Sequence, residues 1–200
     1  GEALCVLSGT VDAIVEAEKK LLADGVDCTR IKISVAAHSK MLDPFLAEFK
    51  AGVSKIKLNA PSIPFVSNLS GTWITKEEAT NPDYWVNQLR NTVRFADGLS
   101  AILKEPNSIF LEAGPGNTLS SLVRSHSEKT NSHSVVSSLR HPQEIVSDYE
   151  YFLRSLGKLW LAGLTIDWSL MRGNEKRKRI PLPTYAFDHQ PYWIEPGKRV

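Results

Sequence analysis

His38 is the residue whose type and surroundings best suit acid–base chemistry. It follows the short apolar run Ile31–Val35, which is typical of a strand, and precedes a segment with helical periodicity. Ser39 can cap that helix, and Pro44 falls in its first turn, where the missing backbone N–H costs little. An imidazole at such a junction has its backbone fixed on both sides, which suits a general base. A histidine that only forms hydrogen bonds in the core or at the surface fits the same residues.

The Gly114-Pro115-Gly116 turn is a second candidate, because backbone N–H groups between a strand and a helix can approach an anion. The chain has neither GxGxxG nor GxxxxGK[ST], so we expect no nucleotide site and interpret the turn as structural. No GxSxG occurs either, which leaves a candidate base without a recognisable nucleophile. The remaining histidines lack the spacing of metal ligands, and we expect all of them at the surface: His126, His133, His141 and His189.

The composition predicts a globular protein with a packed core. The chain has 200 residues and 42% apolar content, enough for one large domain or two small ones. Its net charge of +2 comes from mixed charges, so we expect no nucleic-acid and no membrane partner. Cys5 and Cys28 lie in apolar runs without metal-ligand spacing, which predicts reduced core thiols in a cytoplasmic protein. The chain begins without methionine on strand-like sequence, which suggests that a preceding segment is absent.

Strands and helices alternate in the predicted secondary structure, which indicates an α/β fold with a mostly parallel sheet and helices on its faces. Strands are expected at residues 3–8, 28–35, 63–68, 108–112 and 135–137. Helices are expected at residues 10–23, 118–125 and 143–162, and three more are expected to begin at Ser39, Pro82 and Phe95. The helix that begins at Ser39 would face inward with Leu42, Phe45, Leu46 and Phe49. Residues 3–35 would then form a β-α-β unit, half of a small α/β subdomain.

The composition changes near the C-terminus. The basic run at residues 172–179 has no aromatic residues interleaved, so a solvated loop fits better than a nucleic-acid site. Residues 180–196 carry four prolines among aromatic side chains and cannot form a core of their own. This segment is predicted to be an extended strap that docks on this domain or on a neighbour.

Four blocks of sequence, in the same order, resemble the acyltransferase domains of modular type I polyketide synthases, which are related to the malonyl transacylases of fatty acid biosynthesis. They are CVLSG at 5–9, VAAHSKMLDP at 35–44, YWVNQLRNTVRF at 84–95 and FLEAGPGNTLSSLVR at 110–124. A fifth block, LPTYAFDHQPYW at 182–193, resembles the segment that follows the acyltransferase and packs back towards the ketosynthase. The likeness covers essentially the whole chain.

The resemblance implies the C-terminal part of an α/β-hydrolase-like acyltransferase core. Residues 1–35 would be the remainder of a small ferredoxin-like subdomain, and residues 36–140 the C-terminal part of the large subdomain. Residues 141–200 would be the post-acyltransferase helix and an extended linker.

Carried over by position, His38 matches the family's catalytic histidine. Gln88 matches the residue whose backbone carbonyl orients that imidazole, so we predict that the ring faces a cleft and approaches this carbonyl. Val35, Ala36 and Ala37 match the residues that line the acyl pocket. Together with His38 they form the tetrad VAAH. It differs both from HAFH, which is common in malonyl-specific members of the family, and from YASH, which is common in methylmalonyl-specific ones. Malonyl is favoured slightly over methylmalonyl as the substrate. The GHSxG serine, the malonyl-binding arginine and the oxyanion-hole glutamine are absent from the chain and should precede residue 1.

The implied function is transfer of malonyl, or a related extender group, from CoA to acyl carrier protein by a Ser–His ping-pong mechanism. The implied partners are the upstream half of the domain, the ketosynthase through the C-terminal linker, and the carrier protein with its phosphopantetheine. No cofactor is expected on this segment, acyl-CoA is the substrate, and the chain alone should be inactive. A non-catalytic docking fragment and a thioesterase-like hydrolase are the alternatives.

Overall fold

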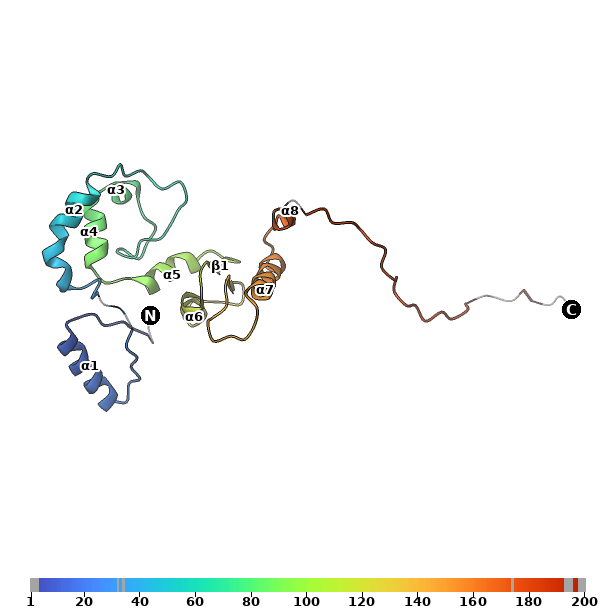
Figure 1. Cartoon of the computed structure of the whole chain (residues 1–200), viewed down its shortest axis with the longest axis horizontal. Coiled ribbons are helices and arrows are strands. Elements are labelled where there is room, and N and C mark those ends of the chain that lie inside the picture. Colours follow the sequence, from blue (N-terminus) through green and yellow to red (C-terminus); the bar gives the residue numbers. More distant parts are fainter. Residues whose placement is uncertain (1–3, 32, 34, 174, 193–195, 198–200) are drawn as a thin grey trace. The chain divides into compact units, whose positions relative to one another are not determined.

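The computed structural model describes residues 4–31, 33, 35–173, 175–192 and 196–197. The chain divides into two compact units, Gly1–Leu164 and Thr165–Val200 (Figure 1). The first unit contains, in order, α1 (Val11–Ala23), the 3₁₀ helix η1 (Lys40–Phe45), α2 (Leu46–Val53), α3 (Lys76–Ala79), α4 (Pro82–Arg90), α5 (Phe95–Leu103), β1 (Ile109–Glu112), α6 (Thr118–Arg124), β2 (Ser134–Ser137) and α7 (Asp148–Leu161). The domain boundaries proposed at residues 35 and 140 stay predictions.

A parallel strand pair with its crossover helix forms the α/β part of the first unit. β1 and β2 pair in parallel, with Phe110 opposite Val135, and α6 connects them in sequence. Parallel neighbours need such a crossover, since a tight turn can join only antiparallel strands. The core lies between this pair and two helices, and consists of Leu99, Leu103 and Val123 with Phe95, Phe110 and Val135 packed around them. The prediction of an α/β fold is confirmed.

Helix α7 covers β2 and is shorter than predicted. The hydroxyl of Ser155 donates to the carbonyl of Ser137 at 2.8 Å, and Leu159 is buried. The helix starts at Asp148 because Ser147 caps it by accepting from the N–H of Glu150 at 3.1 Å. Residues 143–147, predicted as its first turn, therefore precede the helix.

The described residues of the two runs beside α1 do not form the predicted strands. Residues 4–8, 28–31, 33 and 35 have irregular backbone, and residues 3, 32 and 34 lie outside the described part of the chain. A strand needs hydrogen bonds to a neighbouring strand, and no such ladder joins the described residues of these runs. The β-α-β prediction is wrong here except for its helix, which Thr10 caps through the N–H of Ala13 at 3.3 Å. Cys5 is exposed and Cys28 half-buried, so neither is the core thiol predicted.

The predicted strand at 63–68 is a loop with one antiparallel bridge between Val66 and Trp73. The buried hydroxyl of Ser67 causes the change of direction. Its oxygen accepts from the N–H groups of Leu69 at 3.0 Å and Ser70 at 3.1 Å, and from the Tyr84 hydroxyl at 2.6 Å. These bonds fold residues 67–70 into a turn, which ends any extended run.

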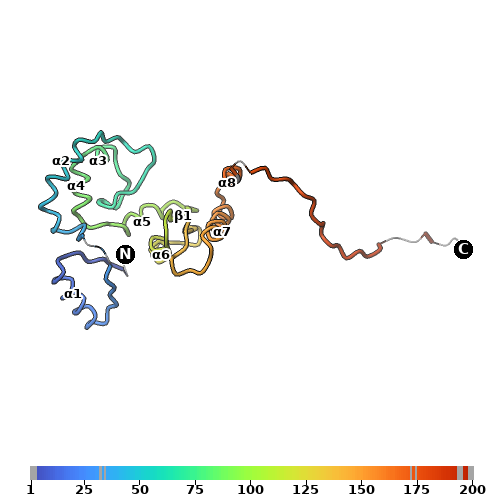
Figure 2. The backbone as a smooth tube through the Cα atoms, in the orientation of Figure 1, coloured from blue at the N-terminus to red at the C-terminus, as the bar shows by residue number. Residues whose placement is uncertain are grey.

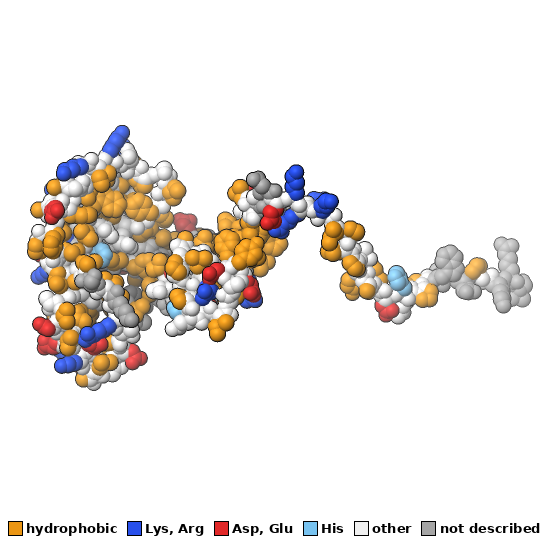
Figure 3. All heavy atoms as spheres, viewed as in Figure 1, with side chains coloured by type: hydrophobic (Ala, Val, Ile, Leu, Met, Phe, Trp, Pro, Cys, Tyr) orange, Lys and Arg blue, Asp and Glu red, His pale blue; other side chains and the backbone are white. Residues whose placement is uncertain are grey.

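Helices η1 and α2 follow His38 and pack against α4. Ser39 caps η1 as predicted, accepting from the N–H of Met41 at 3.2 Å. The predicted inner face is only partly covered: Phe45 is 61% and Phe49 38% exposed. Many other hydrophobic side chains also lie at the surface (Figure 3).

The second unit contains α8 (Trp168–Arg172), which Asp167 caps through the N–H of Ser169 at 2.9 Å. Residues 175–192 are exposed and have no regular secondary structure (Figure 2). The ring of Tyr185 meets that of Phe187 edge to face, with centroids 4.9 Å apart. The predicted extended strap and its docking stay predictions, and Trp193 lies outside the described residues.

Within the part of the chain that the structure describes, no helix combines the length and apolar content needed to cross a membrane.

Candidate active site

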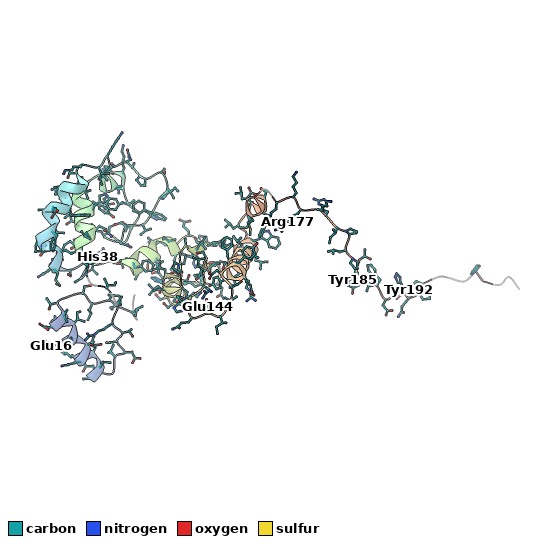
Figure 4. All side chains as sticks on the ribbon, viewed as in Figure 1. Glu16, His38, Glu144, Arg177, Tyr185 and Tyr192 are labelled. Carbon is teal, nitrogen blue, oxygen red and sulfur yellow. The ribbon has the colours of Figure 1, made fainter. Side chains whose placement is uncertain are left out.

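The imidazole of His38 lies at the C-terminal end of α4, where helix carbonyls have no partner within the helix (Figure 4). The backbone N–H of His38 donates to the carbonyl of Leu89 at 3.2 Å. Its Nδ1 lies 3.1 Å from the carbonyl oxygen of Gln88 and 2.9 Å from that of Asn91. The predicted approach to Gln88 is therefore confirmed, and two further carbonyl partners were not foreseen.

These partners fix the tautomer of the neutral ring. A carbonyl oxygen only accepts hydrogen bonds, so Nδ1 must carry the proton that both carbonyls share. Nε2 of the neutral imidazole then keeps its lone pair and can accept a proton.

His38 has a left-handed backbone, with φ at 56°. This conformation costs a non-glycine residue roughly 1–2 kcal/mol, although histidine adopts it more often than most residues. Such strain persists only where the surroundings enforce it, and it concentrates at functional sites. Here the bond to the Leu89 carbonyl holds the strained residue on α4.

The side chain of Ser39 holds the residues on either side of His38 in place. The Ser39 hydroxyl donates to the carbonyl of Ala36 at 2.7 Å, which closes a tight turn around His38. The predicted pocket residues come just before it: Val35 is exposed, and Ala36 and Ala37 are half-buried. Their place in an acyl pocket stays a prediction, as does a cleft in front of His38.

The glycine-proline turn lies between β1 and α6 as predicted, and a carboxylate of this chain occupies the start of α6. Asn117, at the capping position, makes no side-chain cap bond. Instead Glu112 accepts from the N–H groups of Leu119 at 3.1 Å and Ser120 at 2.8 Å. The helix start thus already has its anion, which supports a structural turn over an anion site.

The pKa of Glu112 reflects this environment. Burial is the largest single influence and raises it, but the hydrogen bonds from Ser120 and Leu119, with the charge of Arg124, outweigh burial. The net result holds the pKa of Glu112 below its ordinary value of 4.5. The carboxylate is therefore charged at neutral pH, when it caps α6.

The other histidines have structural contacts. His133 is buried, at 5% exposure, which corrects the prediction that it lies at the surface. Its Nδ1 accepts from the N–H of Thr130 at 3.1 Å, and Nε2 lies 3.3 Å from the carbonyl of Glu105. His126 is half-buried, with Nε2 3.2 Å from the carbonyl of Ala96 and Nδ1 3.3 Å from the N–H of Glu128. Both rings have a hydrogen-bond partner at each nitrogen, whereas the carbonyls that contact the His38 ring among the described residues both face Nδ1.

No group of three or more metal-ligating side chains gathers among the described residues. The described site offers the chemistry of one oriented imidazole. Sequence reasoning missed Asn91 and Leu89, although both lie in the block that contains Gln88.

Residues 1–165 match the family model described as "Acyl transferase domain". The chain belongs to this family. It is 34% identical over 200 residues to a phenolphthiocerol/phthiocerol polyketide synthase of Mycobacterium tuberculosis, a match that covers 98% of this chain and 13% of the relative. The predicted likeness to polyketide synthase acyltransferases is thus confirmed.

Solved acyltransferase domains share the fold. The acyltransferase domain of ZmaA is 41% identical, with a TM-score of 0.75 over 88% of this chain and 40% of that one. The acyltransferase domain of SpnD, in complex with 2-(pent-4-yn-1-yl)malonyl, is 36% identical, with a TM-score of 0.73 over 78% of this chain and 38% of that one. The chain thus spans less than half of each of these two solved acyltransferases and about an eighth of the Mycobacterium tuberculosis polyketide synthase.

Proposed function

We propose that this chain supplies the general base of a Ser–His acyltransferase within a cytoplasmic polyketide synthase. His38 is the proposed base, and the carbonyls of Gln88 and Asn91 orient it. The chain has no GxSxG, so the nucleophilic serine, the oxyanion donors and the carboxylate-binding arginine would come from a segment outside these 200 residues. One observation carries the proposal: Nδ1 faces two carbonyls at 3.1 and 2.9 Å, which leaves Nε2 to take a proton.

In the first half-reaction, Nε2 of His38 accepts the serine proton as the serine oxygen attacks the thioester carbonyl of an acyl-CoA. The tetrahedral intermediate collapses with cleavage of the C–S bond, and the CoA sulfur leaves with the proton from the imidazolium. In the second, the phosphopantetheine thiol of a carrier protein gives its proton to Nε2 and attacks the acyl-serine ester. The serine oxygen then leaves and regains that proton. Nδ1 keeps its proton, and its two carbonyl partners, throughout.

The acyl group proposed is malonyl or a related extender. The family and the malonyl-type ligand of the SpnD acyltransferase support this class. The proposed pocket residues Val35, Ala36 and Ala37 include no large aromatic ring, so a methyl branch is not excluded by size. One methyl group is worth only about 1–3 kcal/mol of discrimination. Competition between malonyl-CoA and methylmalonyl-CoA would measure the preference.

The proposed partners are the rest of the acyltransferase domain, a carrier protein, and a ketosynthase reached through residues 141–200. The exposed aromatic side chains of Tyr185 and Phe187 support a docking role for the end of this segment. Such a role is also what a non-catalytic docking fragment would need, so activity must decide between the two.

The decisive experiment uses the polypeptide that joins these residues to the serine-bearing segment. Labelled malonyl-CoA should form an acyl-serine ester and pass the label to a carrier protein. His38→Ala should lower both rates by about 10²–10⁴-fold while the protein stays folded. The matched control is His126→Ala, which removes a half-buried histidine outside the site and should keep the wild-type rates.

Each alternative predicts a different product. A thioesterase would release free malonate whether or not a carrier protein is present, and a docking fragment would form no acyl-enzyme at all. Wild-type loading in the His38→Ala variant would refute His38 as the base. The 200-residue chain alone should load nothing, because a base without its nucleophile cannot form the ester.

A further inference from the structure

Two ion pairs tie α4 to the helical segment that follows His38, one near each end of α4. Near its start, Nζ of Lys50 in α2 lies 2.6 Å from the Asp83 carboxylate. At its last residue, Nε of Arg90 donates to the Asp43 carboxylate in η1. Asp83 and Arg90 are seven positions apart, which is roughly 10 Å along a helix. The two pairs thus connect the same elements at well separated points.

The pair at the end of α4 frames the His38 site. Arg90 stands between Leu89 and Asn91, whose carbonyls accept from the backbone and the ring of His38. Asp43 is five residues after His38, on the helix that the His38 turn leads into. The Arg90 side chain is 24% exposed and that of Asp43 is 53% exposed, so the protein shields this pair from solvent on the Arg90 side only.

The His38 contacts need such a restraint. The acceptors of Nδ1 are carbonyls of Gln88 and Asn91, two different peptide groups, and the ring reaches both from one strained backbone position. Hydrogen bonds weaken beyond about 3.2 Å and fail near 3.6 Å. A small shift of the His38 turn along α4 would therefore release the ring, and relaxation of the left-handed backbone would favour that shift.

We propose that the Arg90–Asp43 ion pair is a positioning device for His38, which holds the imidazole on the end of α4 with its proton on Nδ1. Arg90 and Asp43 act through His38 and touch no substrate. The catalytic consequence rests on the proposed function, but the position of the ring can be measured without any reaction.

The test is nitrogen NMR of the whole 200-residue chain labelled with [¹⁵N]histidine, at alkaline pH where the ring is neutral. The chain has five histidines, and His38→Gln identifies the His38 signals by their disappearance. In the wild type, Nδ1 should carry the proton. Arg90→Gln and Asp43→Asn should each lower the ratio of the Nδ1–H to the Nε2–H form by about fivefold, the effect of losing one partly shielded ion pair.

Lys50→Gln is the matched control, because it breaks the pair at the other end of α4. It should leave the His38 signals unchanged. The double variant of Arg90 and Asp43 should be no worse than either single one, as two partners of one interaction are not additive. Arg90→Lys keeps the charge and should therefore retain most of the wild-type ratio of the Nδ1–H to the Nε2–H form of His38.

Two results would overturn the proposal: wild-type signals in Arg90→Gln and Asp43→Asn, or the same loss in Lys50→Gln, which would indicate general loosening. Thermal unfolding of each variant shows whether it folds. If Arg90→Gln does not fold, the His38 signals of Asp43→Asn and Arg90→Lys decide the question in its place. In the joined acyltransferase, Arg90→Gln should lower kcat about fivefold with KM for acyl-CoA unchanged. If the NMR results are as expected but the joined wild-type acyltransferase is inactive, the proposed function is rejected and the positioning role of the ion pair is retained.

Discussion

Replacing Glu112 by glutamine tests how the turn between β1 and α6 is stabilised. Glutamine keeps the size of the side chain and one carbonyl oxygen, but it removes the charge. The carboxylate accepts from two N–H groups, at 3.1 and 2.8 Å, at the start of a helix without another side-chain cap. Glu112→Gln should therefore destabilise the first unit by weakening both bonds at once.

The size of the effect follows from these two bonds. A hydrogen bond to a charged group contributes about 1.5–3 kcal/mol and a neutral one about 1 kcal/mol. Glu112 is half-buried, so solvent screening reduces the difference between the two. Glu112→Gln should then cost about 1.5 kcal/mol at neutral pH. For a chain of this length, that corresponds to a decrease in Tm of about 3–6 °C.

The contribution of Glu112 to stability should depend on pH. The pKa of folded Glu112 lies below 4.5, so the unfolded chain takes up this proton first as the pH falls. The stabilisation is complete above pH 4.5 and is lost as the pH falls below it, through the folded pKa. Urea unfolding at a series of pH values should show wild type and Glu112→Gln converging in acid.

Glu77→Gln is the control, since it removes an exposed carboxylate in the first turn of α3. It should change stability by less than about 0.5 kcal/mol. Equal stability of wild type and Glu112→Gln at neutral pH would refute the capping role. A difference that stays constant into acid would show that the charge is not its source.

Three further predictions concern packing and association. Gly71→Ala should cost about 2–4 kcal/mol in urea unfolding, because its backbone has φ of +73° and a Cβ would lie 2.5 Å from the Cβ of Asp97. Gly25→Ala, with φ of +77° and nothing within 4 Å, should cost only about 1 kcal/mol, and equal losses would contradict the clash. Tyr84→Phe should cost about 1 kcal/mol by removing the buried donor to Ser67, and unchanged stability would argue against that bond. The isolated chain should self-associate through its exposed apolar side chains, and a monodisperse monomer by light scattering would contradict this.

Local signals predicted the helices better than the strands. Caps and periodicity lie within the helix they define, so the helices expected at residues 10–23 and from Pro82 agree with α1 and α4, which Thr10 and Asn81 cap. The apolar runs at residues 3–8 and 28–35 looked like strands, but a strand also depends on a partner that its own sequence does not contain. Helix α3 was missed although Thr75 and Glu78 form a capping box, a pattern that sequence alone displays.

The candidate site was predictable only in part. The motif that contains His38 and the block that contains Gln88 predicted one contact, which the structure shows at 3.1 Å. The carbonyl of Asn91 and the pair of Arg90 with Asp43 depend on where α4 ends relative to the His38 turn. A backbone acceptor cannot be predicted from residue type, because every residue has a carbonyl.

This dependence on carbonyls has a consequence for how the site tolerates mutation. A carboxylate that orients a histidine is lost with one substitution, whereas the acceptors of His38 remain whatever side chain stands at Gln88 or Asn91. Alanine at Gln88 should leave the ring in place, and an alanine scan of α4 would overlook the acceptor there. Changes in chain length would reveal it: one residue inserted in the last turn of α4 would rotate these carbonyls by about 100° and separate them from the imidazole. The two acceptors of this histidine therefore depend on the length of a helix rather than on the side chains at positions 88 and 91.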